Sequence, residues 1–235
     1  MKKIFAMMAL FATVVCANAQ LMRAEELEKY AENLYGSKWV DIAANLKADA
    51  TLTLDKNNSH TFIQVVEAKG RTATQLYTTL NYWFTATFND ANSTIKLNDK
   101  ETGCIIAQGS VEGVATHTGG MNKYNVSIHP VIRVDIKEEK CRVTYSLQAY
   151  NVIKSSGGGI LGQVSAGLSD GKVDTKDINE TWPLDQTYPF AEKDAFGAKK
   201  TSSKALIMSY AYSQVLMDKI ETAIKEGMVG EDDDW

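Results

Sequence analysis

The chain has 235 residues and a formal net charge of −4, with 29 acidic and 25 basic side chains. A chain of this length buries about 70% of the surface that it exposes when unfolded, so its core needs no metal or disulfide. The acidic balance argues against a nucleic-acid partner, because such binding depends on the neutralisation of phosphates.

Residues 1–19 are predicted to form a signal peptide. Two lysines follow Met1, residues 4–15 form an apolar run, and residues 17–19 have the small-x-small pattern that signal peptidase recognises. The run is shorter than the roughly 20 apolar residues that span a bilayer, and no later segment is long and apolar enough to do so. We therefore expect a mature chain that begins at Gln20, has no transmembrane span, carries a net charge of −6 and is exported to the periplasm, cell surface or medium.

A competing interpretation makes Cys16 the acylated first residue of a lipoprotein. That processing requires a small residue before the cysteine and usually a leucine three residues before it, where this chain has Val15 and Thr13. We therefore favour cleavage after Ala19.

Residues 20–47 are predicted to form an N-terminal helical segment of two short helices, which Gly36 separates. In the first helix, Leu27, Ala31 and Leu34 recur at helical spacing.

The main domain, residues 48–226, begins with a predicted strand hairpin and a helix. Leu52 and Leu54 lie in the first strand, and the second strand, residues 61–68, follows turn-forming residues at 55–59. The clearest helix of the chain covers residues 72–89. Its apolar stripe, which is typical of a core-facing helix, consists of Leu76, Leu80, Phe84 and Phe88.

Predicted strands at residues 93–97 and 104–114 follow, and then the strongest alternation in the sequence. Residues 124–136 and 141–149 alternate apolar with polar side chains, and the polar residues 137–140 join them into a hairpin. One register matches the apolar faces, because a slip of one residue turns every apolar side chain towards solvent. This register pairs Ile136 with Cys141, Val134 with Val143, Ile132 with Tyr145, and Asp135 with Arg142.

Residues 155–177 are rich in Gly and Ser and are predicted to form a flexible loop. An extended segment at 181–190 leads to a long helix over 203–226, which Gly227 ends, and residues 227–235 form an acidic tail. We therefore predict an α+β fold, in which a twisted antiparallel sheet carries two main helices on one face. The predicted order is a strand hairpin, a helix, a run of antiparallel strands, a long loop and a helix.

Apolar and aromatic residues follow a diffuse pattern along these elements. The pattern lies in residues 62–70 (FIQVVEAKG), Leu76-Tyr77, Tyr82-Trp83-Phe84, Phe88, 103–109 (GCIIAQG), 132–134 (IRV) and 141–144 (CRVT). It resembles the exported bacterial proteins grouped as domain of unknown function 4468 (DUF4468), over roughly residues 50–226. The resemblance implies a TATA-binding-protein-like (TBP-like) fold with the element order β-α-β-β-β-β-α, and no particular activity. A fold shared with a DNA-binding protein is no argument for DNA binding.

The polar face of the predicted sheet is the candidate binding surface. It consists of Asn125, Ser127, His129, Arg133, Asp135, Arg142, Thr144, Ser146, Gln148 and Tyr150. The alternative is an ordinary solvated sheet face without a ligand. The expected partner is an unidentified protein or ligand of the cell envelope.

The sequence contains no HExxH, paired CxxC or GxSxG motif, and we predict no catalytic residue, metal or cofactor. An enzyme with a site made of Cys104 or Cys141 and His129 is the alternative, since such partners meet in space rather than in sequence. Both cysteines share parity with core-facing positions, which favours buried thiols over a nucleophile and over a disulfide. We therefore prefer a non-catalytic binding or assembly module of the cell envelope.

Export is the first testable prediction. Protein recovered from its native host is expected to begin at Gln20 and to fractionate outside the cytoplasm, because residues 1–19 have the three regions of a signal peptide. Intact-mass analysis checks this. A retained Met1 or a lipid on Cys16 would contradict it.

Overall fold

The structure, a computed structural model, describes residues 24–37, 54–88, 95–157, 159–169, 176–187 and 198–227. The predicted signal peptide, the second N-terminal helix and Leu52 lie outside the described residues. The same holds for the acidic tail beyond Gly227.

The described strands form two antiparallel sheets. Sheet A has the strand order β1-β7-β6-β3-β2, made of β1 (His60–Glu67), β7 (Lys140–Leu147), β6 (Val131–Lys137), β3 (Cys104–Gln108) and β2 (Ile95–Asp99). Sheet B has the order β4-β5-β8-β9, made of β4 (Val111–Thr118), β5 (Asn122–Ile128), β8 (Ala149–Ser156) and β9 (Lys176–Pro183).

Three pairs of strands continue from one sheet into the other. β3 leads into β4, β5 into β6, and β7 into β8, with only residues 109–110, 129–130 and 148 between them. Each of the predicted strands at 104–114, 124–136 and 141–149 is therefore divided into two. The strands form two sheets instead of the single sheet that the sequence predicts. Proline contributes to the break, because Pro130 has no N–H for a ladder. Its carbonyl accepts a hydrogen bond from Gly109 N at 2.9 Å.

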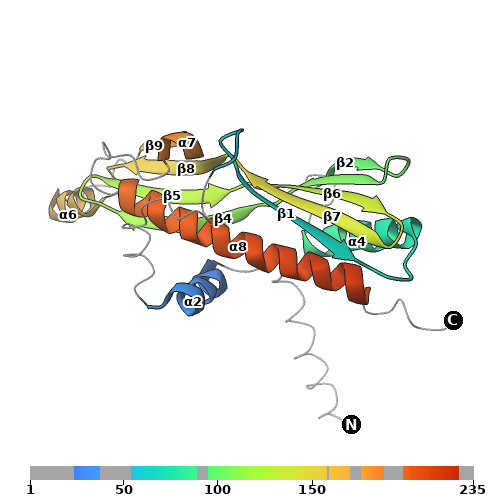
Figure 1. Cartoon of the computed structure of the whole chain (residues 1–235). Helices are drawn as coiled ribbons and strands as arrows, with labels where there is room; N and C mark the ends of the chain where they lie inside the picture. The colour runs from blue at the N-terminus through green and yellow to red at the C-terminus, as the bar shows by residue number, and fades with distance from the viewer. Residues whose placement is uncertain are drawn as a thin grey trace, which may run out of the picture.

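The two main helices lie on one face of the sheets, as the sequence predicts (Figure 1). The long helix α8 (Ala198–Glu226) contacts β1 and β7 of sheet A and β4 and β5 of sheet B. The helix α4 (Ala73–Thr87) packs beside α8 and against β6, and α2 (Ala24–Tyr35) packs against α8 and β4. The core therefore lies between α8 and both sheets. Its helical side includes Leu206, Ile207, Ala211, Tyr212, Leu216, Ile220 and Ile224.

Both main helices have well-defined ends, although α8 begins at Ala198 and not at residue 203 as predicted. Thr72 and Gln75 form a capping box at the start of α4, in which Thr72 Oγ1 accepts from Gln75 N at 3.2 Å and Gln75 Oε1 accepts from Thr72 N at 2.9 Å. Gly227, with a φ of +77°, follows the last residue of α8. Arg71 donates to the carbonyl of Ile224 at 3.0 Å, which ties the end of α8 to the loop before α4.

The prediction of a flexible loop at residues 155–177 is wrong in its described part. β8 extends to Ser156, the helix α6 (Ile160–Ser169) follows, and β9 begins at Lys176. A Cβ at Gly159 would meet the carbonyl oxygens of Gly119 and Gly120 at 2.5 and 2.6 Å. Glycine is therefore required for close approach between backbones, and not for flexibility. The short helix α7 (Leu184–Thr187) follows β9, within the segment predicted to be extended.

The predicted register of the 124–149 hairpin is confirmed for its β6–β7 part. Ile136 faces Cys141, Val134 faces Val143, Ile132 faces Tyr145, and Asp135 faces Arg142. The strands extend one residue further on each side than expected, so that Lys137 pairs with Lys140 and only Glu138 and Glu139 form the turn. Val134, Val143 and Tyr145 are buried, whereas Arg133 and Arg142 are exposed.

Substitutions on the two faces of this hairpin are expected to lower the free energy of unfolding by unequal amounts. Val143→Asp should lower the free energy of unfolding by at least about 3 kcal/mol, because it places an unpaired carboxylate in the core. Arg142→Ala should cost less than about 1 kcal/mol, because its side chain is 54% exposed and Arg133 still pairs with Asp135. Urea unfolding of both variants measures the difference. Equal shifts in the midpoint would contradict this assignment of faces.

Candidate functional site

The candidate site is the face of sheet A that points away from α4 and α8, which we call the outer face. Strand register aligns its side chains in rows, since directly paired residues point to the same side of a sheet. One row consists of Val65, Arg142, Asp135, Cys104 and Asp99. The next row consists of Ile63, Thr144, Arg133, Ile106 and Leu97.

Two arginines clamp Asp135 at the centre of this face. Arg133 donates from Nε and Nη2 to Oδ1 at 2.9 and 2.7 Å. Arg142 donates from Nε and Nη2 to Oδ2 at 3.1 and 2.7 Å. Partial burial opposes ionisation of Asp135, but the hydrogen bonds and charges of Arg133 and Arg142 outweigh it and lower the pKa of this carboxyl. Both guanidinium groups are therefore held in place, and their side chains stay about half exposed.

Aliphatic side chains surround the clamp. Ile63 and Val65 of β1, Val131 of β6 and Leu97 of β2 are all exposed. An exposed apolar cluster of this kind is unusual for a surface without a partner, whereas single exposed aliphatic residues are common. The outer face thus combines an apolar rim with two oriented arginines.

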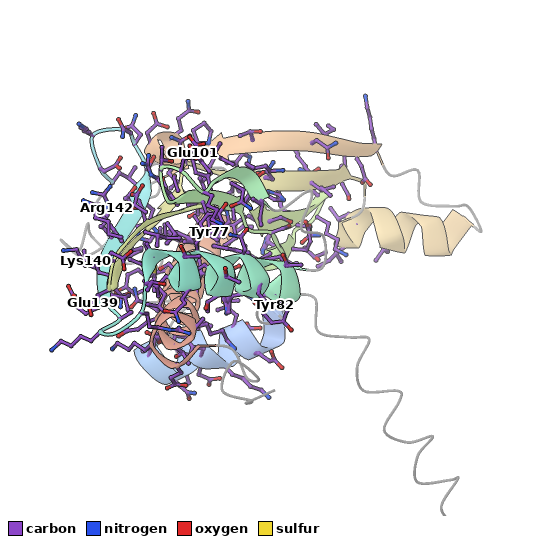
Figure 2. The ribbon with its side chains drawn as sticks, turned by 90° about the vertical axis from the view of Figure 1, so that its right-hand side faces the viewer. Tyr77, Tyr82, Glu101, Glu139, Lys140 and Arg142 are labelled. Atoms are coloured by element: carbon purple, nitrogen blue, oxygen red, sulfur yellow. The ribbon has the colours of Figure 1, made fainter. Side chains whose placement is uncertain are left out.

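A hollow of about 210 Å³ lies at the end of the outer face nearest the β6–β7 turn. It is lined by Val65, Asp135, Lys137, Lys140, Cys141 and Arg142. Figure 2 views the molecule from this end, and Arg142, Lys140 and Glu139 follow one another down the edge where β1 and β7 lie. Three cations against one carboxylate make this hollow suited to an anionic group.

A second hollow, of about 280 Å³, lies on sheet B and is lined mostly by residues with polar side chains. Ser127 Oγ donates to Glu112 Oε2 at 2.6 Å, and His129 Nε2 lies 3.8 Å from Glu112 Oε1. His129 Nδ1 and Asn151 Oδ1 are 3.1 Å apart. Ser127 bonds to the Glu112 carboxylate and not to the His129 imidazole. Ser127 and His129 therefore do not form a nucleophile–base pair.

The structure divides the ten predicted binding residues between the sheets. Five lie on the outer face of sheet A, namely Arg133, Asp135, Arg142, Thr144 and Ser146. Asn125 and Ser127 lie on sheet B, while His129 and Gln148 lie at the junctions between strands.

The placement of Tyr150 on the polar face is wrong, because its side chain is only 1% exposed. Val131 pairs with Ser146 and Ile128 pairs with Tyr150, so β7–β8 has one more residue than β5–β6 between these pairs. An extra residue in one strand reverses the side to which the following side chains point. Tyr150 therefore enters the core.

Periodicity in the sequence does not reveal the aliphatic members of the outer face. Residues 62–66 (Phe-Ile-Gln-Val-Val) do not alternate, so periodicity could not show which apolar side chains of β1 face solvent. The only signal was the register of the hairpin, which places Ile63 beside Thr144 and Val65 beside Arg142 once β1 is known to pair with β7.

Cys104 and Cys141, the two cysteines among the described residues, are free and occupy opposite sides of sheet A. Cys141 faces the core as expected, and burial raises its pKa to about 12. The expectation that Cys104 faces the core is wrong, because Cys104 pairs with Asp135 on the outer face. It is nevertheless only 7% exposed. Burial raises the pKa of the Cys104 thiol, and Asp135 raises it further against the opposing charge of Arg133.

Neither cysteine meets His129. Cys104 lies opposite Asp135, six residues along the chain from His129, which corresponds to about 20 Å in an extended strand. Cys141 lies opposite Ile136, one residue further away. The structure therefore does not assemble the Cys–His site that the enzyme alternative requires.

His60 is the most perturbed histidine of the described residues. It stacks on Tyr210 and meets Phe62 edge-on, with ring centroids 5.9 and 4.6 Å apart. Burial lowers the pKa of His60 to about 4, so the core holds a neutral imidazole at neutral pH. This residue serves packing and is remote from the outer face.

A family model matches the central part of the chain. Residues 62–151 match the family model described as "Domain of unknown function (DUF4468) with TBP-like fold", which confirms the resemblance stated above. A TBP-like protein from Parabacteroides distasonis ATCC 8503 is 12% identical, with 74% of this chain and 97% of that chain covered at a TM-score of 0.47. A DUF4468 family protein from Bacteroides ovatus ATCC 8483 is 13% identical, with 74% and 95% covered at a TM-score of 0.41. No curated protein matches the sequence.

Two further observations concern only the described residues. None of their helices is long and apolar enough to cross a membrane. No group of three or more His, Cys, Asp or Glu side chains among them is arranged to hold a metal ion.

The thiols provide a direct test of the enzyme alternative. We expect both cysteines of the folded, reduced protein to react slowly with iodoacetamide at neutral pH, because burial raises the pKa of each thiol and a thiolate is the reactive form. Mass spectrometry in native buffer and in urea, with and without reductant, measures this. Fast labelling of one cysteine in the folded, reduced protein would support a nucleophile, and Cys104→Ser and Cys141→Ser variants would identify it.

Proposed function

We propose that the chain is an exported, non-catalytic binding module of the bacterial cell envelope, which holds a partner protein on the outer face of sheet A. The observation that carries this proposal is the uncovered outer face. Its aliphatic rim and clamped arginines are supported from behind by α4 and α8.

The chemistry of the face indicates the kind of partner. Arginine and apolar side chains are enriched in protein interfaces and among the residues that dominate binding energy. Because Asp135 orients both guanidinium groups in advance, little side-chain entropy is lost when a partner binds. The Nη1 atoms of Arg133 and Arg142, with Lys137 and Lys140 nearby, favour a partner that presents a carboxylate beside an apolar patch.

The proposal of export rests on residues 1–19. Their charged start, apolar run and small-x-small ending support secretion, and secretion would place the outer face in contact with envelope proteins. The enzyme alternative gains no support from the geometry, because the cysteines and His129 are far apart along the strands.

Binding can be tested with two variants of the outer face and one matched control. The chain from Gln20 is immobilised and the proteins that it retains from the envelope fraction of its host are quantified. Ile63→Asp and Arg142→Ala should each weaken retention at least about tenfold, because each removes a central contact.

Leu34→Asp is the control, because Leu34 is also a half-exposed aliphatic residue but lies on α2, on the helical side of the molecule. Circular dichroism establishes that all three variants remain folded. Retention that is unchanged by both outer-face variants, or equally reduced by Leu34→Asp, would refute the assignment of this face.

A further inference from the structure

The helix α6 and the turn on which it rests form an exposed apolar tip. Ile160, Leu161 and Val164 of α6 and Met121 of the β4–β5 turn each expose more than half of their surface. Isolated aliphatic residues on a surface need no explanation, but four large ones gathered on one projection do.

The tip carries no charge. Between Lys154 and Asp170, residues 155–169 contain no Asp, Glu, Lys or Arg. An ordinary surface helix has charged residues on the side away from the core, and α6 has none. With 10 residues it is about 15 Å long, half the thickness of a bilayer's hydrocarbon core.

The backbone holds this tip in place. Gly157 N and Gly159 N donate to the carbonyl of Met121 at 3.0 and 3.3 Å, and Ile160 N donates to the carbonyl of Gly119 at 3.0 Å. Leu161 N donates to the carbonyl of Gly120 at 2.9 Å. The first turn of α6 is thus satisfied by the β4–β5 turn, which leaves its aliphatic side chains free to face outward.

The tip stands apart from the rest of the molecule. Figure 1 shows α6 at the end of the molecule opposite the β6–β7 turn, and Figure 2 shows it projecting sideways, away from α2, α4 and α8. The tip is therefore convex, and a surface that covers it must be either concave or deformable.

Area and charge favour lipid over protein as the surface that covers the tip. Four partly exposed side chains cannot supply the about 800 Å² per partner that a standard protein interface buries. A bilayer interface needs no matching groove, because each apolar side chain that enters it contributes separately. Lys123 and Lys176 are exposed on the strand ends that lead to α6, paired with Ser155 and Ser156, where a basic side chain would meet lipid phosphates. Asp177, which accepts a hydrogen bond from Ser155 Oγ at 2.6 Å, is the acidic residue beside them.

We propose that α6 and Met121 form a membrane-contacting tip that enters the interface of a phospholipid bilayer. Ile160, Leu161 and Val164 provide the apolar contact, and the glycine-mediated docking of α6 fixes its direction. The proposal goes beyond partner binding on the outer face of sheet A and concerns a different part of the molecule.

The test is sedimentation of the chain from Gln20 with vesicles of phosphatidylethanolamine and phosphatidylglycerol, and with vesicles of phosphatidylcholine. This chain contains every described residue and lacks the apolar signal segment, which would bind lipid by itself. We expect binding to both, stronger to the anionic vesicles. Leu161→Asp and Val164→Asp should each raise the lipid concentration for half-maximal binding at least about tenfold.

Ile63→Asp is the matched control, because it changes an exposed aliphatic residue of the outer face and should leave vesicle binding unchanged. If Ile63→Asp no longer retains the partner protein but still binds vesicles, then partner binding on the outer face and membrane contact by α6 are separate properties. The membrane proposal is overturned if the unaltered chain does not sediment with either vesicle, or if binding survives both α6 variants. It is also overturned if the tip instead mediates a dimer, seen by analytical ultracentrifugation, that the same variants abolish.

Discussion

The burial of one long helix against two sheets is the constraint on which the rest of this structure depends. α8 has 29 residues and is about 44 Å long, enough to contact both sheet A and sheet B. Buried residues of both sheets and of this helix belong to one hydrophobic core. At the junction, a Cβ on Gly109 would lie 3.3 Å from the Tyr212 hydroxyl of α8, so that a larger residue there would require Tyr212 or Pro130 to shift slightly. The hydroxyls of Tyr145 and Tyr212 are buried there without a hydrogen-bond partner among the described residues, a cost that close packing offsets.

The position of α8 also decides which surfaces remain available for function. With α8 and α4 on one side of sheet A, the other side faces solvent, as antiparallel sheets permit. The Asp135 clamp there contributes little to stability, because ion pairs of exposed arginines are worth at most about 1 kcal/mol. Its value lies in orientation, since the guanidinium groups are held in one arrangement before any partner arrives. The raised pKa of Cys104 follows from the same cluster, which shields the thiol and places a carboxylate beside it.

The outer face and the α6 tip lie on different sheets, and their chemistry differs. The first is mixed, with charges fixed by strand register, whereas the second is uncharged and fixed by backbone hydrogen bonds between α6 and the β4–β5 turn. A fold that resembles a DNA-binding family does not determine either property, because function depends on the side chains of a site and not on the fold that carries it. The acidic balance of the chain and the mixed charge of the outer face are both unlike a phosphate-binding surface.

The sequence by itself determined the elements whose signals are local. The stripe from Leu76 to Phe84 predicted α4, the Gly227 stop predicted the end of α8, and matching parity predicted the β6–β7 register. Only the tertiary structure decided where strands divide between sheets, because the breaks at Pro130 and Gln148 depend on partners far along the chain. One additional residue between β7 and β8 turned Tyr150 inward, and pairing with Asp135 turned Cys104 outward. α6 formed where glycines predicted a loop, because the hydrogen-bond partners that Gly159 and Ile160 need lie on a turn some 40 residues away. Periodicity describes a residue's neighbours in sequence, whereas burial is set by its neighbours in space.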